Sequence, residues 1–345
     1  MEQERFLTST LNKQDKQFEE TLRPQSFDAF PGQDKVKERL KLYVDASRER
    51  GEPLNHLLLS GPPGLGKTTL AYIIANERGG KIKSSSGPVI EKPADLAGLL
   101  TSLNDGDFLF IDEIHRLNIS VEEYLYSAME DFFIDIMIDQ GPGARSVRLN
   151  IPHFTLIGAT TRQGMLSAPL RSRFNLVNRL DYYPPEVLKT IIFRSSKILG
   201  IPIEDDGAAE LAKRSRGTPR IANNLLKWAR DYAQIKNNNI IDRDSASKAL
   251  EMLDIDQDGL DEMDNRILET IVFKFNCRPV GLKNISVSVG EDEGTIEEVY
   301  EPFLIQEGFL LRTPKGRTVT NKTLKRFGIK PTGENPMQGA LFDDL

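Results

Sequence analysis

Residues 61–69 read GPPGLGKTT and directly follow a short apolar run at residues 56–60. The pattern G-x-x-x-x-G-K-[ST] is typical of a phosphate-binding loop, in which small residues let successive backbone N–H groups face a chain of phosphates. A helix-like stretch at residues 68–78 comes next, and the positive end of its dipole would also attract an anion. The stretch therefore predicts a nucleoside triphosphate site on a strand–loop–helix unit.

Within this loop the residue types indicate separate roles. Lys67 is long enough to reach the β- and γ-phosphates, and the hydroxyl of Thr68 is expected to bind Mg²⁺. The loop residues that we expect to bind the nucleotide are Gly61, Gly64, Gly66, Lys67, Thr68 and Thr69.

The composition is that of a globular protein with more than one domain. The chain has 345 residues, of which 39% are hydrophobic and 28% charged, and one core rarely serves so long a chain. A single cysteine, Cys277, excludes an internal disulfide and favours a structural role in a reducing cytoplasm. No apolar stretch approaches the roughly 18 residues of a membrane span, and the charged N-terminus lacks a secretory apolar region. We expect a cytoplasmic protein with no membrane association.

Basic residues gather near the C-terminus of an acidic chain. The net charge is −6, yet residues 308–330 carry seven basic side chains and no acidic one. A local basic patch on an acidic body predicts one surface that faces a polyanion, and a solvated basic tail is the alternative.

The first half of the chain alternates strand-like and helical patterns. Short apolar runs at residues 56–60, 107–111 and 154–159 indicate strands buried on both faces of a parallel sheet. Helical patterns at residues 68–78 and 121–131 lie between them. This is the order of an α/β doubly wound fold. Residues 132–151 interrupt it with alternating segments on either side of a Gly-Pro-Gly turn, which predicts an inserted β-hairpin.

After Pro184-Pro185 the pattern changes to helices alone. Four helices are expected at residues 186–199, 206–215, 221–235 and 244–253, followed by an acidic stretch, residues 254–264, that reads as a solvated linker. Short helices and a hairpin at residues 308–320 then indicate a winged helix. The predicted domains are a large α/β ATPase domain (1–182), an all-α lid (183–254), a winged-helix head (255–330) and a flexible tail (331–345).

Two strands deliver polar residues to the edge of the sheet where the loop lies. The second strand ends in Asp112-Glu113, a pair that would help hold Mg²⁺ and polarise the attacking water, respectively. His115 has no ligand partner at metal-site spacing, so a packing role is expected. The third strand ends in Thr160-Thr161, and either hydroxyl could contact the γ-phosphate or the water, as at the sensor 1 position of AAA+ ATPases.

Arginines at two further places suit phosphoryl transfer, which needs positive charge on the transferred group. Residues 169–174 read PLRSRF, and in AAA+ proteins the second arginine of such a pair, here Arg173, acts on the nucleotide of the neighbouring subunit. Residues 217–220 read GTPR and resemble a sensor 2 motif, in which Arg220 would contact the γ-phosphate.

Motifs along residues 20–328 together resemble the RuvB family of AAA+ ATPases, the motors of bacterial Holliday-junction branch migration. They are LRP from Leu22, GQ from Gly32, GPPGLGKTTLA from Gly61, SGP from Ser86, LFIDEIHRL from Leu109, AMED from Ala128, GPGARS from Gly141, FTLIGATTR from Phe154, PLRSRF from Pro169, RSRGTPRIAN from Arg214, GLDEMD from Gly259, RPVGL from Arg278, YEPFLIQEGFL from Tyr300 and RTPKGR from Arg312.

The resemblance implies a homohexameric ring that hydrolyses ATP with Mg²⁺ and pumps duplex DNA during recombination and repair. It implies RuvA, as a tetramer engaged by the 132–151 hairpin, and the resolvase RuvC as partners on a Holliday junction. The nucleotide-binding positions that it adds are Leu22 and Arg23 at the adenine, Glu130, Asp131 and Phe132 nearby, Tyr183 and Arg220 closing the site, and Arg173 as the finger in trans. Arg312 and Arg317 would contact DNA phosphates, which are the same in any sequence.

The chain departs from the family pattern in a few places. Glu293 stands where family members carry an arginine, and its carboxylate would repel a DNA phosphate. The family's LRDRFG is LRSRFN here, with Ser172 and Asn175 as the changes and the arginine pair intact, and Ser127 replaces a usual proline before AMED. The departures put one DNA contact in doubt and leave the ATP site intact.

Two other classes share some of these features. A clamp-loader subunit would carry a helical collar in place of the C-terminal hairpin, and an ATP-switched winged-helix regulator would hydrolyse ATP slowly and bind a specific DNA sequence. The set Lys67, Asp112, Glu113 and Arg173 favours turnover, and the head motifs favour the RuvB family over both.

Overall fold

The computed structural model describes residues 19–137 and 146–330. These residues fall into two compact units, 19–243 and 244–330. The predicted flexible tail at residues 331–345 and the first 18 residues lie outside the described part. Among the described residues, no helix has both the length and the apolar character needed to cross a membrane.

A five-stranded sheet forms the centre of the first unit. All neighbouring strands run parallel, in the order β2-β3-β6-β1-β7. The bounds are β2 (Ile82–Ser86), β3 (Phe108–Asp112), β6 (Thr155–Thr160), β1 (Leu57–Ser60) and β7 (Leu176–Arg179). The three strands predicted from apolar runs are confirmed, and they are the three central ones. Because all strands are parallel, their carboxyl ends meet at one edge of the sheet.

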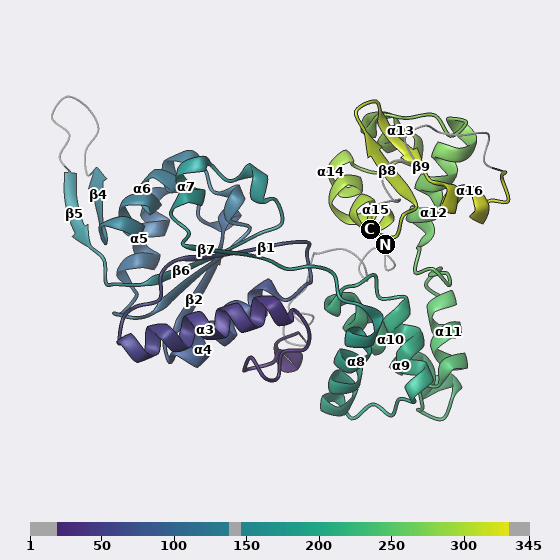
Figure 1. The fold of residues 1–345 in the computed structure, drawn as a ribbon, viewed down its shortest axis with the longest axis horizontal. Coiled ribbons are helices and arrows are strands. Elements are labelled where there is room, and N and C mark those ends of the chain that lie inside the picture. Colours follow the sequence, from purple (N-terminus) through teal and green to yellow (C-terminus); the bar gives the residue numbers. More distant parts are fainter. Residues whose placement is uncertain (1–18, 138–145, 331–345) are drawn as a thin grey trace. The chain divides into compact units, whose positions relative to one another are not determined.

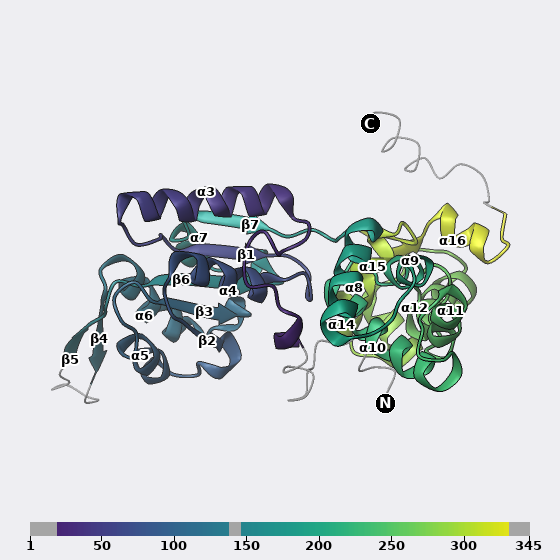
Figure 2. The ribbon, with the colours of Figure 1, turned by 90° about the horizontal axis from the view of Figure 1, so that it is seen from below.

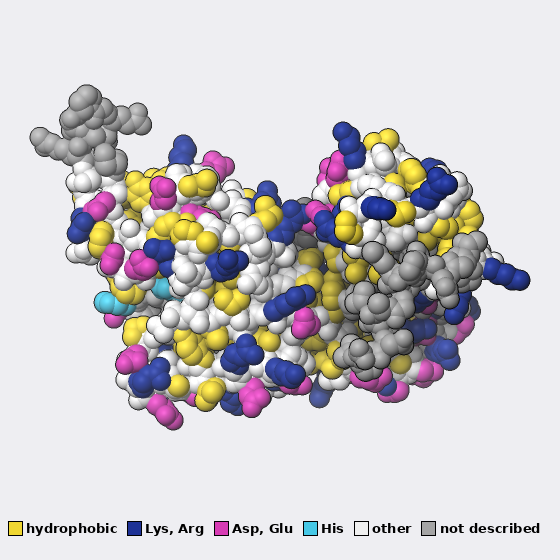
Figure 3. All heavy atoms as spheres, turned by 45° about the horizontal axis from the view of Figure 1, so that its top comes forward, with side chains coloured by type: hydrophobic (Ala, Val, Ile, Leu, Met, Phe, Trp, Pro, Cys, Tyr) yellow, Lys and Arg dark blue, Asp and Glu magenta, His cyan; other side chains and the backbone are white. Residues whose placement is uncertain are grey.

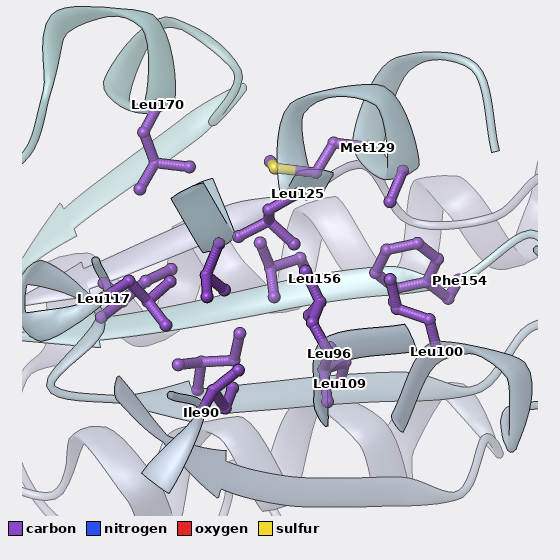
Figure 4. Close-up of a cluster of buried hydrophobic side chains, with 14 of the residues drawn as sticks. Ile90, Leu96, Leu100, Leu109, Leu117, Leu125, Met129, Phe154, Leu156 and Leu170 are labelled. Carbon is purple, nitrogen blue, oxygen red and sulfur yellow. The ribbon is translucent and has the colours of Figure 1, made fainter. Parts of the chain in front are cut away.

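Helices cover both faces of this sheet. Helices α3 (Asp34–Arg50) and α4 (Lys67–Arg78) lie against one face, and α5 (Pro93–Thr101) and α6 (Ile119–Glu130) against the other (Figures 1 and 2). Figure 4 shows apolar side chains from the second face converging into one cluster, with Leu96 and Leu100 of α5, Leu125 and Met129 of α6, and Leu109, Phe154 and Leu156 from β3 and around β6. The cluster fixes α6 on the sheet, a position that matters for the site.

The predicted insertion is a β-hairpin. Strands β4 (Phe133–Met137) and β5 (Ser146–Asn150) pair antiparallel, with Ile134 opposite Leu149. Figures 1 and 2 both show the pair extending away from the layered sheet and helices. The turn expected at residues 140–143 lies outside the described residues.

Three helices complete the first unit: α8 (Pro185–Leu199), α9 (Asp205–Lys213) and α10 (Pro219–Lys236). Both α8 and α10 start with proline at the first helical position, where the missing N–H costs nothing. A fourth helix, α11 (Arg243–Glu251), spans the boundary between the two units. The helical region that the sequence predicts after Pro184-Pro185 is confirmed.

The second unit combines short helices with a two-stranded sheet. Helices α12 (Glu262–Glu269), α13 (Leu282–Val289), α14 (Glu293–Thr295), α15 (Glu301–Gln306) and α16 (Asn321–Arg326) accompany strands β8 (Leu310–Thr313) and β9 (Gly316–Val319). The hairpin predicted at residues 308–320 is confirmed, with Arg312 directly opposite Arg317. Gly316 has φ +128°, and a Cβ there would lie 2.4 Å from the carbonyl oxygen of Val280, so this turn requires glycine.

The acidic stretch at residues 254–264 is part of the folded head, and its interpretation as a solvated linker was wrong. Leu260 is fully buried in the head core. Asp256 accepts hydrogen bonds from the backbone N–H of Leu260 and from the guanidinium of Arg326, which also binds Asp258 at 2.6 Å. The negative charge of this stretch is therefore partly neutralised by a cation from α16. Elsewhere, acidic and basic side chains are interspersed over the face drawn in Figure 3.

Candidate nucleotide-binding site

A cavity of about 460 Å³ lies at the carboxyl edge of the sheet in the first unit. Its volume suits a small-molecule ligand. Predicted nucleotide-site residues on its wall are Leu22, Arg23, Gly64, Gly66, Lys67, Thr68, Thr69, Asp112, Glu113, Tyr183 and Arg220. The structure thus brings together residues from the loop, the second strand, the start of the described chain and α10.

Positive φ angles make the loop dependent on glycine. Gly61 has φ +134°, and a Cβ there would lie 2.4 Å from the carbonyl oxygen of Leu180. No residue with a side chain therefore fits at this position. Gly64 has φ +77°, and its missing side chain leaves room for Thr218 and Arg220. The loop can therefore turn its backbone toward the cavity while the lid side chains approach it.

Lys67, the first residue of α4, points into the loop. Its Nζ donates to the carbonyl oxygens of Gly61 at 2.7 Å and Pro62 at 2.8 Å, and only 6% of the residue is exposed. Burial, opposed by Asp112 and Glu113 and reinforced by Arg220, lowers the pKa of Lys67 to about 8. This ammonium group is thus destabilised until an anion arrives.

We expect nucleotide binding to take up a proton above about pH 8. A polyphosphate beside Nζ raises the pKa of Lys67 in the bound state, so a lysine that is partly neutral in the free protein becomes charged on binding. The affinity for nucleotide should fall as the pH rises from about 8 toward the bound-state pKa. Below about pH 7 the lysine is charged in both states, so it should cause no change of affinity with pH. Calorimetry at about pH 9 in two buffers of different ionisation enthalpy measures the uptake.

Lys67→Arg provides the control, because a guanidinium stays charged over this range and has no proton to gain. Equal binding enthalpies in the two buffers for the wild-type protein would contradict the expectation.

Asp112 and Glu113 lie at the end of β3, as the sequence predicts. Glu113 has φ +47°, a left-handed conformation that is uncommon outside glycine and often found at functional sites. Its Oε2 accepts a hydrogen bond from the Thr161 hydroxyl at 3.2 Å and lies 3.2 Å from Nδ1 of His115. The carboxylate is therefore held from two sides at the wall of the cavity.

The two threonines at the end of β6 have different environments. Thr160 is fully buried, and its Oγ1 lies 2.9 Å from Nδ1 of His115. Thr161 contacts the carboxylate of Glu113. His115 therefore belongs to the site's supporting network, a role that its lack of metal-ligand spacing concealed. The two threonines thus contact different groups, Thr161 the carboxylate of Glu113 and Thr160 the ring of His115.

Arg220 reaches the cavity from the start of α10. Its Nε donates to Oε1 of Glu19 at 2.6 Å, and its terminal nitrogen lies 3.5 Å from the other carboxylate oxygen. Sequence reasoning did not find Glu19, which is 201 residues away in the chain. It also missed Phe30, whose ring lies 3.1 Å from where a Cβ of Gly66 would be, and Arg194, which donates to the carbonyl oxygen of Leu22 at 2.6 Å.

Two more predicted residues support the cavity wall. The hydroxyl of Tyr183 donates to the carbonyl oxygen of Leu65 at 3.1 Å, and burial raises the pKa of this tyrosine well above its usual range. The guanidinium of Arg23 lies 4.6 Å from the centre of the Tyr72 ring. These contacts join the start of the described chain and the lid to the loop.

Seven predicted residues do not line this cavity: Gly61, Thr160, Thr161, Glu130, Asp131, Phe132 and Arg173. The last four lie at the end of α6 and of α7 (Ala168–Ser172). The guanidinium of Arg173 donates to Glu130 at 3.0 Å and to the carbonyl oxygen of Pro169 at 2.8 Å. A group that serves a neighbouring subunit has to lie away from its own cavity, so this position suits the predicted action in trans, which stays a prediction.

The two predicted DNA contacts of the wing differ in accessibility. The side chain of Arg312 is 57% exposed and binds Glu297 at 2.9 Å. The side chain of Arg317 is 11% exposed and forms hydrogen bonds of 2.9–3.2 Å with the buried carboxylate of Glu301. Arg312 is therefore free to turn toward a phosphate, while Arg317 is held within the head.

The fold and the site define a class. A parallel sheet carrying a phosphate-binding loop, a carboxylate pair on the next-but-one strand and an arginine from a helical lid is the arrangement of an AAA+ ATPase. Three family models match in succession: "Holliday junction DNA helicase RuvB P-loop domain" at residues 22–180, "RuvB AAA lid domain" at 183–256 and "RuvB C-terminal winged helix domain" at 257–328. The chain belongs to the RuvB family. The winged-helix match also excludes the clamp-loader alternative.

Similar proteins span nearly the whole chain. The Holliday junction branch migration complex subunit RuvB of Chlorobium luteolum is 56% identical over 338 residues, which cover 98% of this chain and 97% of that protein. The RuvB subunit of Chlorobium chlorochromatii is 60% identical over 310 residues, 90% of this chain and 88% of that one. The solved structure of the Thermotoga maritima RuvB Holliday junction branch migration motor has a TM-score of 0.82 and 51% identity, covering 90% of this chain and all of that one.

Proposed function

We propose that this protein is the ATP-driven motor subunit of a Holliday junction branch migration complex. It hydrolyses ATP to ADP and phosphate and uses the energy to move duplex DNA during recombination and repair in the cytoplasm. The observation that carries this proposal is that one chain joins a complete ATP site to a winged-helix head, and that all three of its domains match RuvB. We take the domain limits 182/183 and 254/255 as part of the proposal.

Phosphate binding falls to the loop and the lid in this proposal. Lys67 exchanges its loop carbonyls for the β- and γ-phosphates, and Arg220 exchanges Glu19 for the γ-phosphate. Leu22, Arg23 and Tyr183 enclose the adenine end. Because Arg220 sits on the lid, the state of the nucleotide sets the position of the lid.

Mg²⁺ would be held by Thr68 and Asp112, whose hydroxyl and carboxylate oxygens are the ligands that this ion prefers. Among the described residues, no group of three or more His, Cys, Asp or Glu side chains is placed to hold a metal ion. When bound, Mg²⁺ would neutralise charge on the phosphate oxygens.

Glu113 is the group that polarises the attacking water. Its αL backbone and its contacts to Thr161 and His115 hold the carboxylate in one orientation. We assign the sensor role to Thr161, because its hydroxyl reaches Glu113 while that of Thr160 is buried behind the strand. Thr161 would thus contact the γ-phosphate and also orient Glu113, the base.

Assembly completes the site in this proposal. Arg173 acts on the nucleotide of the neighbouring subunit in a homohexameric ring, with Glu130, Asp131 and Phe132 beside it. The position of all four outside their own cavity supports this arrangement. The 132–151 hairpin binds a RuvA tetramer, and Val147 of β5, which is 41% exposed, offers RuvA an apolar contact. RuvC joins the complex at the junction, and exposed Arg312 supplies positive charge toward the DNA, while Arg317 stays bound to Glu301 and supports the wing.

A synthetic four-way junction with homologous arms tests the proposal. The protein with ATP, Mg²⁺ and RuvA should convert the junction to duplex products, and Lys67→Ala should not. If the wild-type protein hydrolyses ATP but never moves the junction, with or without RuvA, the motor function is wrong while the ATPase stands.

Glu293→Arg is expected to tighten binding to duplex DNA. Glu293 is exposed at the start of α14, in the position where the family carries arginine, and the change replaces repulsion of a phosphate by attraction. We expect an affinity several-fold higher and a salt dependence steeper by about one phosphate contact. Fluorescence anisotropy over a series of salt concentrations measures both.

Glu269→Arg is the matched control, because it changes the net charge equally from an exposed position on α12. If both substitutions tighten binding equally, the effect is one of overall charge, and position 293 does not face the DNA.

A further inference from the structure

One face of α6 is directed toward the short helix that carries Arg173. Glu122, Tyr126 and Glu130 are four residues apart and so lie above one another on this face. Each of them has a partner in or next to α7: Glu122 binds Ser167, Tyr126 contacts Ser167 and Arg173, and Glu130 binds Arg173. The face therefore holds both ends of α7.

The Arg173 guanidinium lies over the ring of Tyr126. Its central carbon is 4.5 Å from the ring centre, within the range of a cation–π interaction. The edge of the group donates to Glu130 and to the carbonyl oxygen of Pro169. The three contacts differ in kind: the ring lies against the face of the guanidinium, while each of the two oxygens accepts from one terminal nitrogen at its edge.

A buried carboxylate fixes the ring in turn. Glu122 is only 6% exposed, and its Oε2 accepts from the hydroxyls of Tyr126 and Ser167, both at 2.7 Å. Ser167 also caps α7, since its Oγ accepts from the backbone N–H of Leu170 at 3.2 Å. Burial, with Glu122 beside it, raises the pKa of Tyr126, so the phenol stays protonated and remains a donor. One carboxylate thus sets both the ring and the start of the helix that ends at Arg173.

We propose that Tyr126, anchored by Glu122, is the positioning residue of the arginine finger. The proposal rests on the proposed role of Arg173 in trans. Glu130 cannot fill this role during hydrolysis, because its carboxylate accepts from a terminal nitrogen of the guanidinium that would bind the neighbour's γ-phosphate. The ring contacts only the face of the guanidinium and leaves its terminal N–H groups available. Arg173 can exchange Glu130 for phosphate while it stays on Tyr126.

Tyr126→Leu tests this in the assembled ring with DNA. We expect kcat for ATP hydrolysis to fall by about 10- to 100-fold, since small displacements of a charge-stabilising group cost factors of this size. The KM for ATP should change less than about 2-fold, because the subunit's own cavity is intact. Tyr126→Phe keeps the ring and loses its bond to Glu122, so it should recover most of the lost kcat. Tyr124→Leu on the same helix is the control, because Tyr124 is also partly buried against the core but lies two residues, roughly 200°, around the helix from Tyr126.

A mixing experiment separates positioning from a general folding defect. Tyr126→Leu subunits keep a sound cavity, so Lys67→Ala subunits, which carry a sound finger, should raise the activity per Tyr126→Leu subunit in mixed rings. No rise on mixing, or a kcat for Tyr126→Leu equal to that of Tyr124→Leu, overturns the positioning role. Arg173→Ala is run in parallel: if it hydrolyses ATP normally, the finger itself is wrong, and if it is inactive while Tyr126→Leu is not, only the positioning role fails.

Discussion

Glu113→Gln should bind ATP about as tightly as the wild-type protein and hydrolyse it at least about 100-fold more slowly. The amide has the shape of the carboxylate and can keep a contact to the Thr161 hydroxyl, but it cannot take a proton from water. Lys67, Arg220 and the loop are unchanged, so ground-state binding should persist. Steady-state hydrolysis with DNA, together with equilibrium binding of a fluorescent ATP analogue, measures the two quantities.

Glu123→Gln is the matched control, because it makes the same chemical change at an exposed position on α6. It should hydrolyse ATP at the wild-type rate. Turnover by Glu113→Gln within about 3-fold of that of this control would remove the role of Glu113 in activating water. Loss of binding together with turnover would instead indicate that the αL backbone at residue 113 needs the carboxylate to fold.

Arg173→Ala subunits should be inactive alone and regain hydrolysis when they are mixed with Lys67→Ala subunits. An arginine finger contributes roughly 10³- to 10⁵-fold to phosphoryl transfer, so its loss should lower kcat nearly to background. A Lys67→Ala neighbour has no working cavity but presents an intact Arg173 to the next subunit. Sites formed between the two variants are complete, and ATPase activity measured against the mixing ratio should pass through a maximum.

Arg171→Ala distinguishes the two arginines of this short helix. It should retain hydrolysis without any partner variant, since Arg171 is exposed and takes no part in the contacts to Glu130 and Tyr126. Mixtures of Arg173→Ala and Lys67→Ala that stay inactive at every ratio would rule out action in trans. Rescue seen for Arg171→Ala in place of Arg173→Ala would move the finger by two residues.

Burial explains which strands could be predicted. The three central strands are continuous apolar runs because helices cover both of their faces. The edge strands β2, with sequence IKSSS, and β7, with sequence LVNR, have partly exposed and polar positions. Their patterns do not differ from those of loops, so the sequence could not indicate them. The order of the strands likewise depends on pairings between distant segments.

The site residues also divide into those that the sequence could predict and those that it could not. Residues that belong to a contiguous motif, such as Lys67 and Glu113, were predictable because their spacing alone carries the chemistry. Glu19, His115 and Tyr126 were not, because each acts through a partner from another segment: Arg220, Thr160 and Arg173, respectively. The choice between Thr160 and Thr161 required the direction of each side chain at the end of β6. Long-range geometry, rather than residue type, decides these roles.

The unequal exposure of the two wing arginines has a consequence for genetics. Loss of Arg317 would leave the buried carboxylate of Glu301 without its main counter-ion, which typically costs several kcal/mol of folding free energy. Loss of exposed Arg312 would leave the fold intact. A screen that scores recombination would place both alleles in one class. The amount of protein in the cell would separate them. Loss of Arg317 should lower the amount of the protein, whereas loss of Arg312 should leave a normal amount of a protein that binds DNA more weakly.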